Sequence, residues 1–242
     1  MLTGPEARHA VTVKRLRMQE RVDLVDGAGL RLVCEVTGAG VGGAKDRLAA
    51  RVLERIEEPT PPLRLTLVQA LAKGGRDEQA VETATEVGVE LVLPWQSERC
   101  VSVWQGAKQA KGRQRWQATA LQAAKQARRA RVPEIGEARD TRRLADWVGR
   151  TVRGGGVVLV LHEEAGTAIS TAMESLGLPA PEEVPPVLAV VVGPEGGISP
   201  EETAVLEAAG AMTVRLGPHV MRTASAGPVA LAVLAHASGL WE

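Results

Sequence analysis

The chain has 242 residues, which suits one large domain or a small domain joined to a larger one. Its 29 basic and 29 acidic side chains cancel, so the overall charge does not indicate a nucleic-acid partner, and the absence of a long apolar run or a secretory signal predicts a cytoplasmic protein without a membrane span. Cys34 and Cys100 stand far apart without metal-ligand spacing, which argues against a disulfide or a metal site and predicts two buried thiols.

Strand patterns and turn signals alternate in the first 60 residues. The strand patterns lie at Val22–Val25, Leu30–Thr37 and Arg47–Ile56, and the turn signals at Asp26-Gly27 and in the glycine-rich stretch Gly38–Gly43. The first two strands and the turn between them predict a β-hairpin in a small barrel. Proline cannot join a central sheet ladder, so the run Pro59–Pro62 predicts a boundary between a domain at 1–60 and a domain at 61–242.

Strands and helices alternate after this boundary. Strand patterns lie at Leu63–Ala70, Leu91–Pro94, Val157–Leu161, Val187–Val192 and Thr213–Leu216, and helical patterns at Asp77–Val87, Gln105–Arg129, Pro200–Ala209 and from Gly227-Pro228 to about Trp241. Near-continuous apolar strands such as Val187–Val192 suit a sheet that is buried on both faces. The alternation predicts an α/β domain with a parallel sheet. We expect the proline-rich segment Leu178–Pro186 to form a surface loop.

The most informative motif begins where the strand Val187–Val192 ends. Its glycines are Gly193, Gly196 and Gly197. They allow either a plain tight turn or the close approach of a ligand to the backbone, and their spacing fits neither a dinucleotide-binding nor a Walker loop. A helix follows at once, because Ser199 suits its N-cap, Pro200 its first position and Glu202 a capping box. Open α/β sheets bind ligands at such strand-to-helix turns.

Two further strand ends carry polar side chains. After the strand Thr213–Leu216, Arg222 stands alone among small and apolar residues, where a buried cation needs a partner. That partner is either Glu195 or a bound substrate. At the end of an earlier strand, His162 and Glu163 either cap the loop or serve as acid–base candidates.

Basic residues gather between Arg99 and Arg131, where there are nine and no Asp or Glu. Such a segment forms either an ordinary solvated helix or a phosphate-binding face. We favour a face for RNA, because no acid within the segment can neutralise the charge.

These motifs together resemble the RsmE family of 16S ribosomal RNA uracil-N3 methyltransferases, within the knotted SPOUT superfamily. The strongest matches are Gly193–Gly197 with Ser199–Glu202, Leu216–Pro218 and Met221–Thr223. Further matches are Gln69–Leu71, Lys73-Gly74, Ala84–Glu86, Gly88, Pro94, Glu98-Arg99, Gln126, Arg128, Arg131–Pro133 and His162–Ala165. Near the N-terminus, the segment from Arg8 to Arg17 and the turn Val22–Gly27 resemble the family's PUA-like RNA-binding domain. The resemblance spans nearly the whole chain.

The resemblance implies a trefoil-knotted, parallel-sheet methyltransferase domain at 61–242 that forms a homodimer, and a PUA-like β-barrel domain at 1–60. Its cofactor is S-adenosylmethionine, and its partner is 16S rRNA or the small ribosomal subunit. The cofactor would be held by Leu161, His162, Gly193, Glu195, Gly196, Gly197, Leu216, Gly217, Val220, Met221, Thr223, Ser225 and Ala226. RNA would be held by Arg8, Arg15, Arg17, Arg99, Lys125, Arg128 and Arg131.

The expected reaction would be accelerated by a cation near the target base. Methylation at N3 of uridine removes the N3 proton and leaves negative charge on the ring oxygens, which a fixed cation stabilises where water is excluded. Arg222 is our candidate for that catalytic role, whereas the sequence does not identify the proton acceptor. Because N3 lies on the Watson–Crick edge, the base must be unpaired when it reacts.

Four positions depart from the family pattern. Ala224 stands where a Glu usually follows the Arg-Thr pair, Ser225 replaces a typical Thr, Gly75 stands where an acidic residue is common, and Thr83 where Lys is usual. Two other functions compete with this hypothesis, and Ala224 favours the second. The chain is alternatively a SPOUT methyltransferase for tRNA or another rRNA base, or an RNA-binding ribosome-assembly factor without activity. Binding of S-adenosylmethionine separates the last of these from an enzyme.

Overall fold

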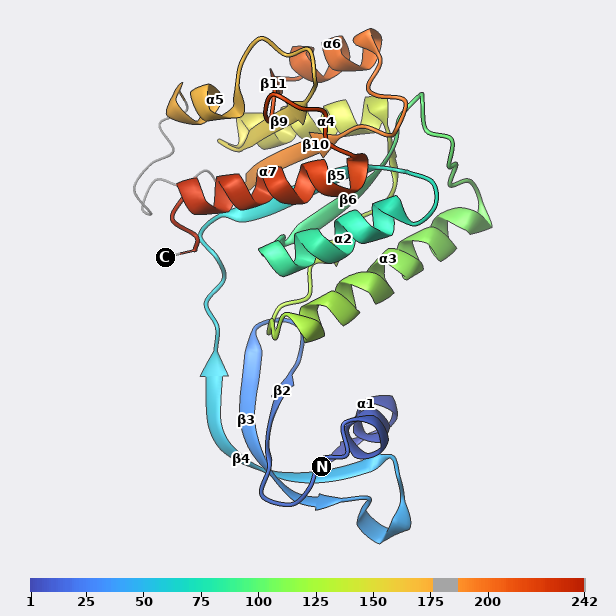
Figure 1. Cartoon of the computed structure of the whole chain (residues 1–242), viewed down its shortest axis with the longest axis vertical. Coiled ribbons are helices and arrows are strands. Elements are labelled where there is room, and N and C mark those ends of the chain that lie inside the picture. The colour runs from blue at the N-terminus through green and yellow to red at the C-terminus, as the bar shows by residue number, and fades with distance from the viewer. Residues whose placement is uncertain (176–186, 242) are drawn as a thin grey trace. The chain divides into compact units, whose positions relative to one another are not determined.

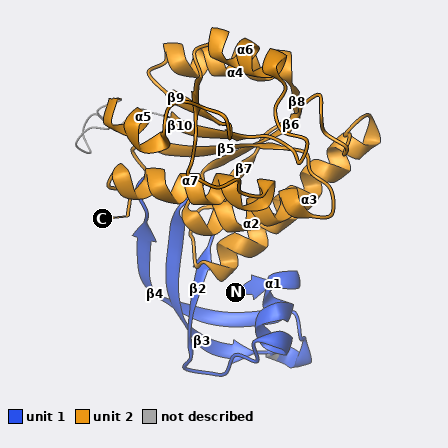
Figure 2. Ribbon diagram, turned by 45° about the horizontal axis from the view of Figure 1, so that its top comes forward, with its two compact units in different colours: residues 1–60 blue, residues 61–242 orange. Residues whose placement is uncertain are grey.

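The computed structural model describes residues 1–175 and 187–241 (Figure 1). The chain divides into two compact units, Met1–Thr60 and Pro61–Glu242, which Figure 2 shows in different colours. The proline-rich segment Leu178–Pro186, for which a surface loop was expected, lies outside the described residues.

The N-terminal unit is built on a four-stranded antiparallel sheet of order β1-β4-β3-β2. Its elements are β1 (Leu2–Thr3), α1 (Pro5–Arg8), a π-helical turn (His9–Val13), β2 (Arg21–Val25), β3 (Leu30–Ala39), a 3₁₀ turn (Val41–Gly43) and β4 (Arg47–Glu57). The predicted hairpin is confirmed, since β2 and β3 pair through a turn in which the Asp26 carboxylate accepts hydrogen bonds from the backbone of Ala28 and Leu30. Those two bonds hold the pKa of Asp26 below its ordinary value.

The expectation of only strands and turns at the N-terminus is wrong for the helical stretch Pro5–Val13. Pro5 occupies the start of α1, where a missing N–H costs nothing, and Ala7 and Ala10 turn inward. They pack with Val36 and Leu48 into a small apolar core of their own. The helical turns thus cover part of one face of the sheet.

The C-terminal unit contains the larger sheet and the remaining helices. Its strands are β5 (Arg64–Ala70), β6 (Leu91–Gln96), β7 (Glu134–Ile135), β8 (Arg139–Asp140), β9 (Val157–Leu161), β10 (Val187–Val192) and β11 (Met212–Val214). Its helices are α2 (Arg76–Val87), α3 (Ala107–Gln126), α4 (Thr141–Arg153), α5 (Ile169–Ser175), α6 (Pro200–Ala208) and α7 (Thr223–Ala237).

The prediction of a parallel sheet is confirmed. The strand order is β11-β9-β10-β5-β6-β7, with β8 also on β6, and every pairing among these strands is parallel. Helices cover both faces: α4 and α6 lie on one side, and α2, α3 and α7 on the other (Figures 1 and 2). The central strands are therefore buried on both faces, which explains the unbroken runs of Val, Leu and Ala in β9 and β10.

Two apolar clusters fill the space between sheet and helices. Leu65 and Leu67 of β5 pack with α2, α3 and α7, whereas Val68 and Ala70 of the same strand pack with α4 and α6. Alternate residues of one strand thus serve opposite layers. Gly227 lets α7 approach the sheet closely, because a Cβ there would lie 2.7 Å from Leu67 Cδ1.

Some elements differ from the sequence predictions. The helices α4 and α5 and the short strands β7 and β8 were not predicted. The last helix begins at Thr223 and not near Gly227-Pro228, so Pro228 lies inside it. Cys34 is buried as expected, but Cys100 is only partly buried. No described helix is both long and apolar enough to cross a bilayer.

Candidate functional site

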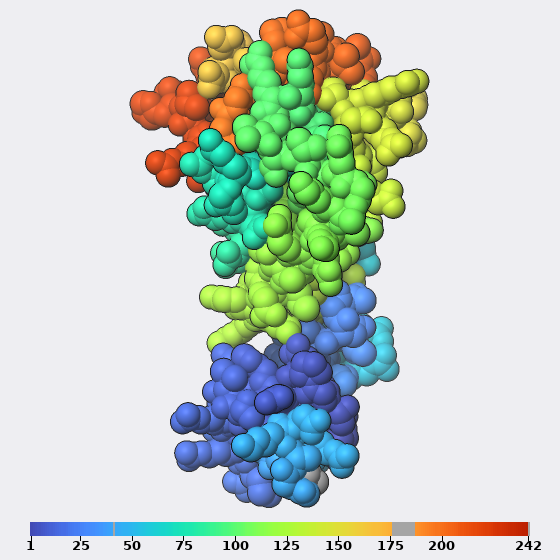
Figure 3. Space-filling view, turned by 90° about the vertical axis from the view of Figure 1, so that its right-hand side faces the viewer, coloured from blue at the N-terminus to red at the C-terminus, as the bar shows by residue number. Residues whose placement is uncertain are grey.

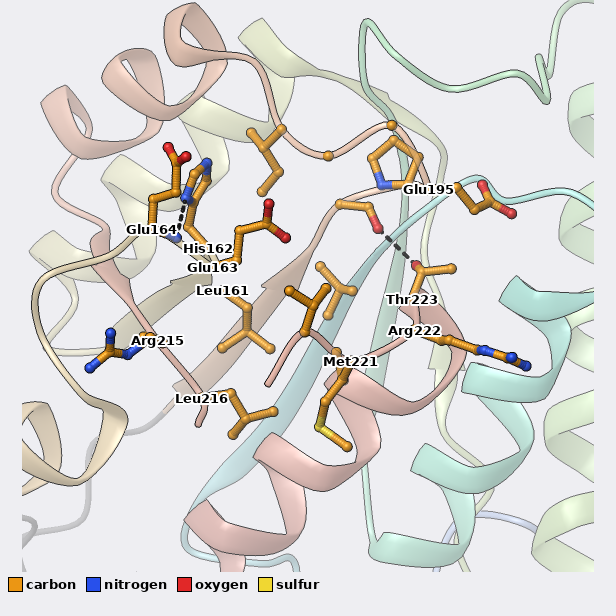
Figure 4. Close-up of a pocket in the computed structure, with 18 of the residues that line it drawn as sticks. Leu161, His162, Glu163, Glu164, Glu195, Arg215, Leu216, Met221, Arg222 and Thr223 are labelled. Atoms are coloured by element: carbon orange, nitrogen blue, oxygen red, sulfur yellow. Dashed lines mark hydrogen bonds between the residues drawn. The ribbon is translucent and has the colours of Figure 1, made fainter. Parts of the chain in front are cut away.

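A pocket of about 880 Å³ opens at the carboxyl ends of three neighbouring strands, β11, β9 and β10 (Figure 4). Its walls come from the ends of these strands and the segments that follow them: 161–164 at β9, 192–198 with Pro200 at β10, and 215–223 with Ala226 after β11. Arg76 and Arg99 complete the lining. The three strand ends singled out in the sequence therefore meet at one hollow, where open α/β sheets bind their ligands.

Nearly all residues that the resemblance assigned to a cofactor line this pocket. They are Leu161, His162, Gly193, Glu195, Gly196, Gly197, Leu216, Gly217, Val220, Met221, Thr223 and Ala226. Ser225 does not line it and lies half-buried in the first turn of α7. Arg222 is also part of the lining, and Ala224 beside it is buried.

The turn after β10 is held in one conformation from several sides. The predicted capping box is confirmed: the Ser199 hydroxyl accepts a hydrogen bond from Glu202 N–H, and the Glu202 carboxylate accepts one from Ser199 N–H. Thr223 of α7 donates from Oγ1 to the Gly193 carbonyl at 2.8 Å. A Cβ at Gly193 would lie 2.7 Å from Ile198 Cγ1, so any side chain at this position would force the turn to shift.

Glu195 pairs with a residue that the sequence did not suggest. Its carboxylate lies 2.8 Å from Arg76 Nη1 at the start of α2 and also accepts a bond from Lys73 N–H at 3.3 Å. Partial burial raises the pKa of Glu195, but hydrogen bonds from its own backbone and from Arg76 outweigh burial and hold it below the ordinary value. The alternative in which Glu195 pairs with Arg222 is therefore wrong.

Arg99 closes the other side of this turn. It donates from Nη1 to the Gly196 carbonyl at 3.1 Å, and a Cβ on Gly196 would approach the Arg99 Cβ to 3.1 Å. Arg99 was assigned to RNA from the resemblance, and its contacts place it at the pocket and not on the long basic helix. Sequence reasoning missed Arg76 as a pocket residue, because its contact with Glu195 spans 119 residues.

The segment after β11 is far more exposed. Pro218, His219, Val220 and Met221 are all exposed, and so is Arg222. The sequence interpretation of Arg222 as a buried cation is therefore wrong. In Figure 4 its side chain points toward α2 and away from Glu163, and the described residues offer it no ion-pair partner. A guanidinium in this position is available to a ligand.

His162 has a defined hydrogen-bonding role. Its Nδ1 accepts a hydrogen bond from Glu164 N–H at 3.2 Å (Figure 4). A neutral imidazole that accepts at Nδ1 carries its proton at Nε2, so His162 can offer a donor to a ligand. This contact makes it a capping residue of the loop, one of the two roles left open by the sequence.

The basic segment is partly neutralised by other elements. Arg115 forms an ion pair with Glu78, and Arg129 pairs with Glu90 and donates to two backbone carbonyls. Arg113 donates to the Ile135 carbonyl. The expectation of an uncompensated segment is wrong for Arg115 and Arg129, because their acidic partners lie outside the segment, on α2 and just before β6.

Other basic side chains of this region remain at the surface. Lys108, Lys111 and Lys125 of α3 and Arg128 after it are exposed, whereas Arg131 is half-buried. Side chains of α3 project from the face of the C-terminal unit shown in Figure 3. In the N-terminal unit, Arg8, Arg15 and Arg17 are all exposed. The described residues contain no group of His, Cys, Asp or Glu arranged to hold a metal ion.

Comparisons with known proteins agree with this fold and pocket. Residues 59–235 match the model of an RNA methyltransferase domain, and residues 2–43 match an RNA methyltransferase PUA domain. A Mycobacterium bovis protein named ribosomal RNA small subunit methyltransferase E is 44% identical over an alignment of 243 positions, which covers 100% of this chain and 88% of that protein.

Two solved structures are similar along nearly the whole chain. A ribosomal RNA small subunit methyltransferase E from Neisseria gonorrhoeae, bound to S-adenosyl methionine, has a TM-score of 0.79 and 25% identity, and covers 96% of this chain and 89% of its own. A Legionella pneumophila methyltransferase with bound cofactor SAM has a TM-score of 0.80 and 27% identity, with coverages of 97% and 90%.

Fold and pocket thus define the class of α/β RNA methyltransferases that carry an N-terminal PUA domain. Within this class, the chain belongs to the ribosomal RNA small subunit methyltransferase E family.

Proposed function

We propose that this protein transfers the methyl group of S-adenosylmethionine to N3 of a uridine in 16S ribosomal RNA, in the cytoplasm. The observation that carries the proposal is the convergence of three strand-end segments on one pocket of about 880 Å³. That volume lies in the range of small-molecule sites. Family membership supports the reaction class, and the resemblance of the motifs supports uridine N3 as the target.

The residues present fit the cofactor chemically. Leu161, Val192 and Leu216 supply apolar surface that suits the adenine ring. The turn at Gly193, Gly196 and Gly197 keeps side chains out of the way, so a ligand can reach backbone N–H and C=O groups there. His162 offers a donor at Nε2. When bound, the cofactor supplies an electrophilic methyl group on a sulfonium.

Arg222 is the proposed catalytic cation. It lines the pocket, is exposed, and has no ion-pair partner among the described residues, so its charge is free to face the uracil oxygens as N3 loses its proton. A carboxylate at position 224 plays no part in this chemistry, because Ala224 fills that position and is buried. The pocket aligns methyl group and N3, which supplies much of the remaining rate enhancement.

RNA recognition is proposed for both units. Exposed arginines of the N-terminal unit, Arg8, Arg15 and Arg17, would contact phosphates, as would Arg99, Lys125, Arg128 and Arg131 of the C-terminal unit. Binding to phosphates releases counterions, so the affinity for small-subunit rRNA should fall steeply between about 50 and 200 mM salt. An affinity that does not change with salt would contradict this assignment.

We further propose the trefoil knot and the homodimer that the family resemblance implies. The helix α7 ends at Ala237 and not near Trp241, and it exposes Val229 (38%) and Val233 (40%), while Trp241 after it is 54% exposed. These apolar side chains suit a buried interface between two copies. Val233→Glu should shift the protein to a monomer in size-exclusion chromatography with light scattering. Val205→Glu, on the equally exposed Val205 of α6, should leave the dimer intact.

Calorimetry with S-adenosylmethionine is the first test of the proposed function. We expect one cofactor site per chain with the purified protein and no site after the pocket is blocked by Gly193→Leu. A wild-type protein that folds but does not bind the cofactor would favour the assembly-factor alternative.

The second test identifies the product. Small-subunit rRNA from cells that lack this protein should lack one 3-methyluridine in nucleoside mass spectrometry, and purified protein with cofactor should restore it. Loss of a different modified nucleoside, or a change in tRNA only, would point to the alternative of another SPOUT methyltransferase.

A further inference from the structure

A buried glutamine on the central strand lies directly behind the pocket. Gln69 is the penultimate residue of β5, its side chain is fully buried, and it pairs in the sheet with Val192, the last residue of β10. It does not line the pocket. Its amide nitrogen donates to Thr223 Oγ1 at 2.9 Å, although the two residues are 154 positions apart.

The hydrogen bonds form a chain that joins three elements. Gln69 Nε2 donates to Thr223 Oγ1, and the Thr223 hydroxyl in turn donates to the Gly193 carbonyl at 2.8 Å. The second amide hydrogen of Gln69 goes to the carbonyl of Ala70 at 3.1 Å. The chain therefore ties the end of β5 to the first residue of α7 and to the first glycine of the turn after β10.

The orientation of the amide follows from the same contacts. If the amide were reversed, its oxygen would face the Ala70 carbonyl, and Thr223 would need two hydroxyl protons to serve both Gln69 and Gly193. With the nitrogen in place, Gln69 Oε1 is buried and finds no hydrogen-bond partner in the described part of the chain. A buried acceptor without a hydrogen-bond partner lowers the free energy of unfolding.

We propose that Gln69 is a positioning residue for the cofactor pocket, which it serves by fixing Thr223 and, through Thr223, the Gly193 turn. The inference rests on the proposed function of the pocket. Thr223 and Gly193 both line the pocket, and Arg222 immediately precedes Thr223. The polar side chain is a poor choice for stability alone, because its only oxygen stays unpaired, whereas its nitrogen sets the relative position of two pocket walls.

The test compares Gln69→Met with Thr66→Val. Methionine has nearly the same shape without the amide, so it removes both the bond to Thr223 and the unpaired oxygen. Thr66 is also fully buried on β5, but its hydroxyl contacts only the Arg64 carbonyl, at 3.4 Å, and it does not line the pocket. The readouts are the Kd for S-adenosylmethionine by calorimetry and the Tm of the protein without cofactor.

We expect Gln69→Met to raise the Kd about fivefold, the amount that corresponds to one hydrogen bond, while its Tm stays within about 3 °C of the wild type. Thr66→Val should leave the Kd unchanged. An unchanged Kd in Gln69→Met, or an equal rise in both variants, overturns the inference. Failure of the wild-type protein to bind the cofactor would instead reject the proposed function, so the two failures are distinguishable.

Thr223→Ser and Thr223→Val test the same link if Gln69→Met does not fold, and if it does fold, Gln69→Met combined with Thr223→Val completes a double-mutant cycle. Thr223→Ser keeps the hydroxyl and should bind the cofactor more tightly than Thr223→Val, which removes it. In the Thr223→Val background, replacement of Gln69 should add less than about twofold to the Kd, because the link is already broken. Independent, multiplicative effects of the two substitutions would contradict a shared chain of bonds.

Discussion

The two glycine-containing segments of the pocket differ in how firmly they are held. The turn after β10 is fixed by Thr223 at Gly193, by Arg76 at Glu195 and by Arg99 at Gly196. The segment after β11, from Pro218 to Arg222, is exposed along its whole length. On the proposed function, the fixed turn would hold the cofactor, and Arg222 in the exposed segment would meet the substrate.

The largest expected effect tests the exposed segment. Arg222→Ala should lower the single-turnover rate of rRNA methylation about 10²- to 10³-fold, because the charge that develops on the uracil oxygens loses its partner. The Kd for S-adenosylmethionine should change by less than about twofold, since the fixed turn is untouched. Arg142→Ala, at an exposed arginine of α4, is the matched control. An unaffected rate would remove Arg222 from the mechanism.

The next prediction compares the two segments directly by adding one methyl group to each. Gly193→Ala places a Cβ 2.7 Å from Ile198 Cγ1, so we expect a loss of about 1–3 kcal/mol in the free energy of unfolding and a rise of about tenfold or more in the cofactor Kd. A Cβ at Gly217 would have no atom within 4 Å, and Gly217 is not among the glycines with a positive φ. The stability of Gly217→Ala should therefore stay unchanged or rise by up to about 1 kcal/mol.

Denaturant unfolding and calorimetry of both variants measure this contrast. Equal losses of stability at the two glycines would show that the segments are held alike and would remove the basis of the comparison. A normal cofactor Kd in a folded Gly193→Ala protein would show that the fixed turn does not hold the cofactor.

The parts of the site that could be predicted are those that depend on residues close together in the sequence. The strand Val187–Val192 and the capped helix that follows it could be predicted because apolar runs and capping residues act over a few positions. The contacts of Arg76 with Glu195 and of Gln69 with Thr223 could not, because they join residues 119 and 154 positions apart. Only the packed fold brings such pairs together.

Other errors came from reading a local signal too strictly. Arg222 was taken as buried because its sequence neighbours are small and apolar, yet the buried residues begin one position later, with Thr223 and Ala224 at the start of α7. Pro228 was taken as the start of that helix, but it is the sixth residue, where its missing N–H costs one hydrogen bond. The helix α4 was missed although Asp140 caps it and Leu144 and Val148 share its buried face.

The smallest expected effect tests the ion pair between Glu195 and Arg76, which helps to hold the fixed turn, through the pH dependence of stability. The pKa of Glu195 lies below its ordinary value of 4.5, so the ion pair with Arg76 contributes its stability in full above about pH 4.5 and loses it as the pH falls through the lowered pKa. Because Arg76 is 43% and Glu195 24% exposed, we expect Glu195→Gln to cost at most about 1 kcal/mol at pH 7 and nothing in strong acid. Urea unfolding at a series of pH values measures the difference, and in an Arg76→Met background the cost at pH 7 should largely disappear. A cost that grows toward acid pH would mean that Glu195 is protonated more readily in the folded protein, and the turn would then be held at this point by something other than its ion pair.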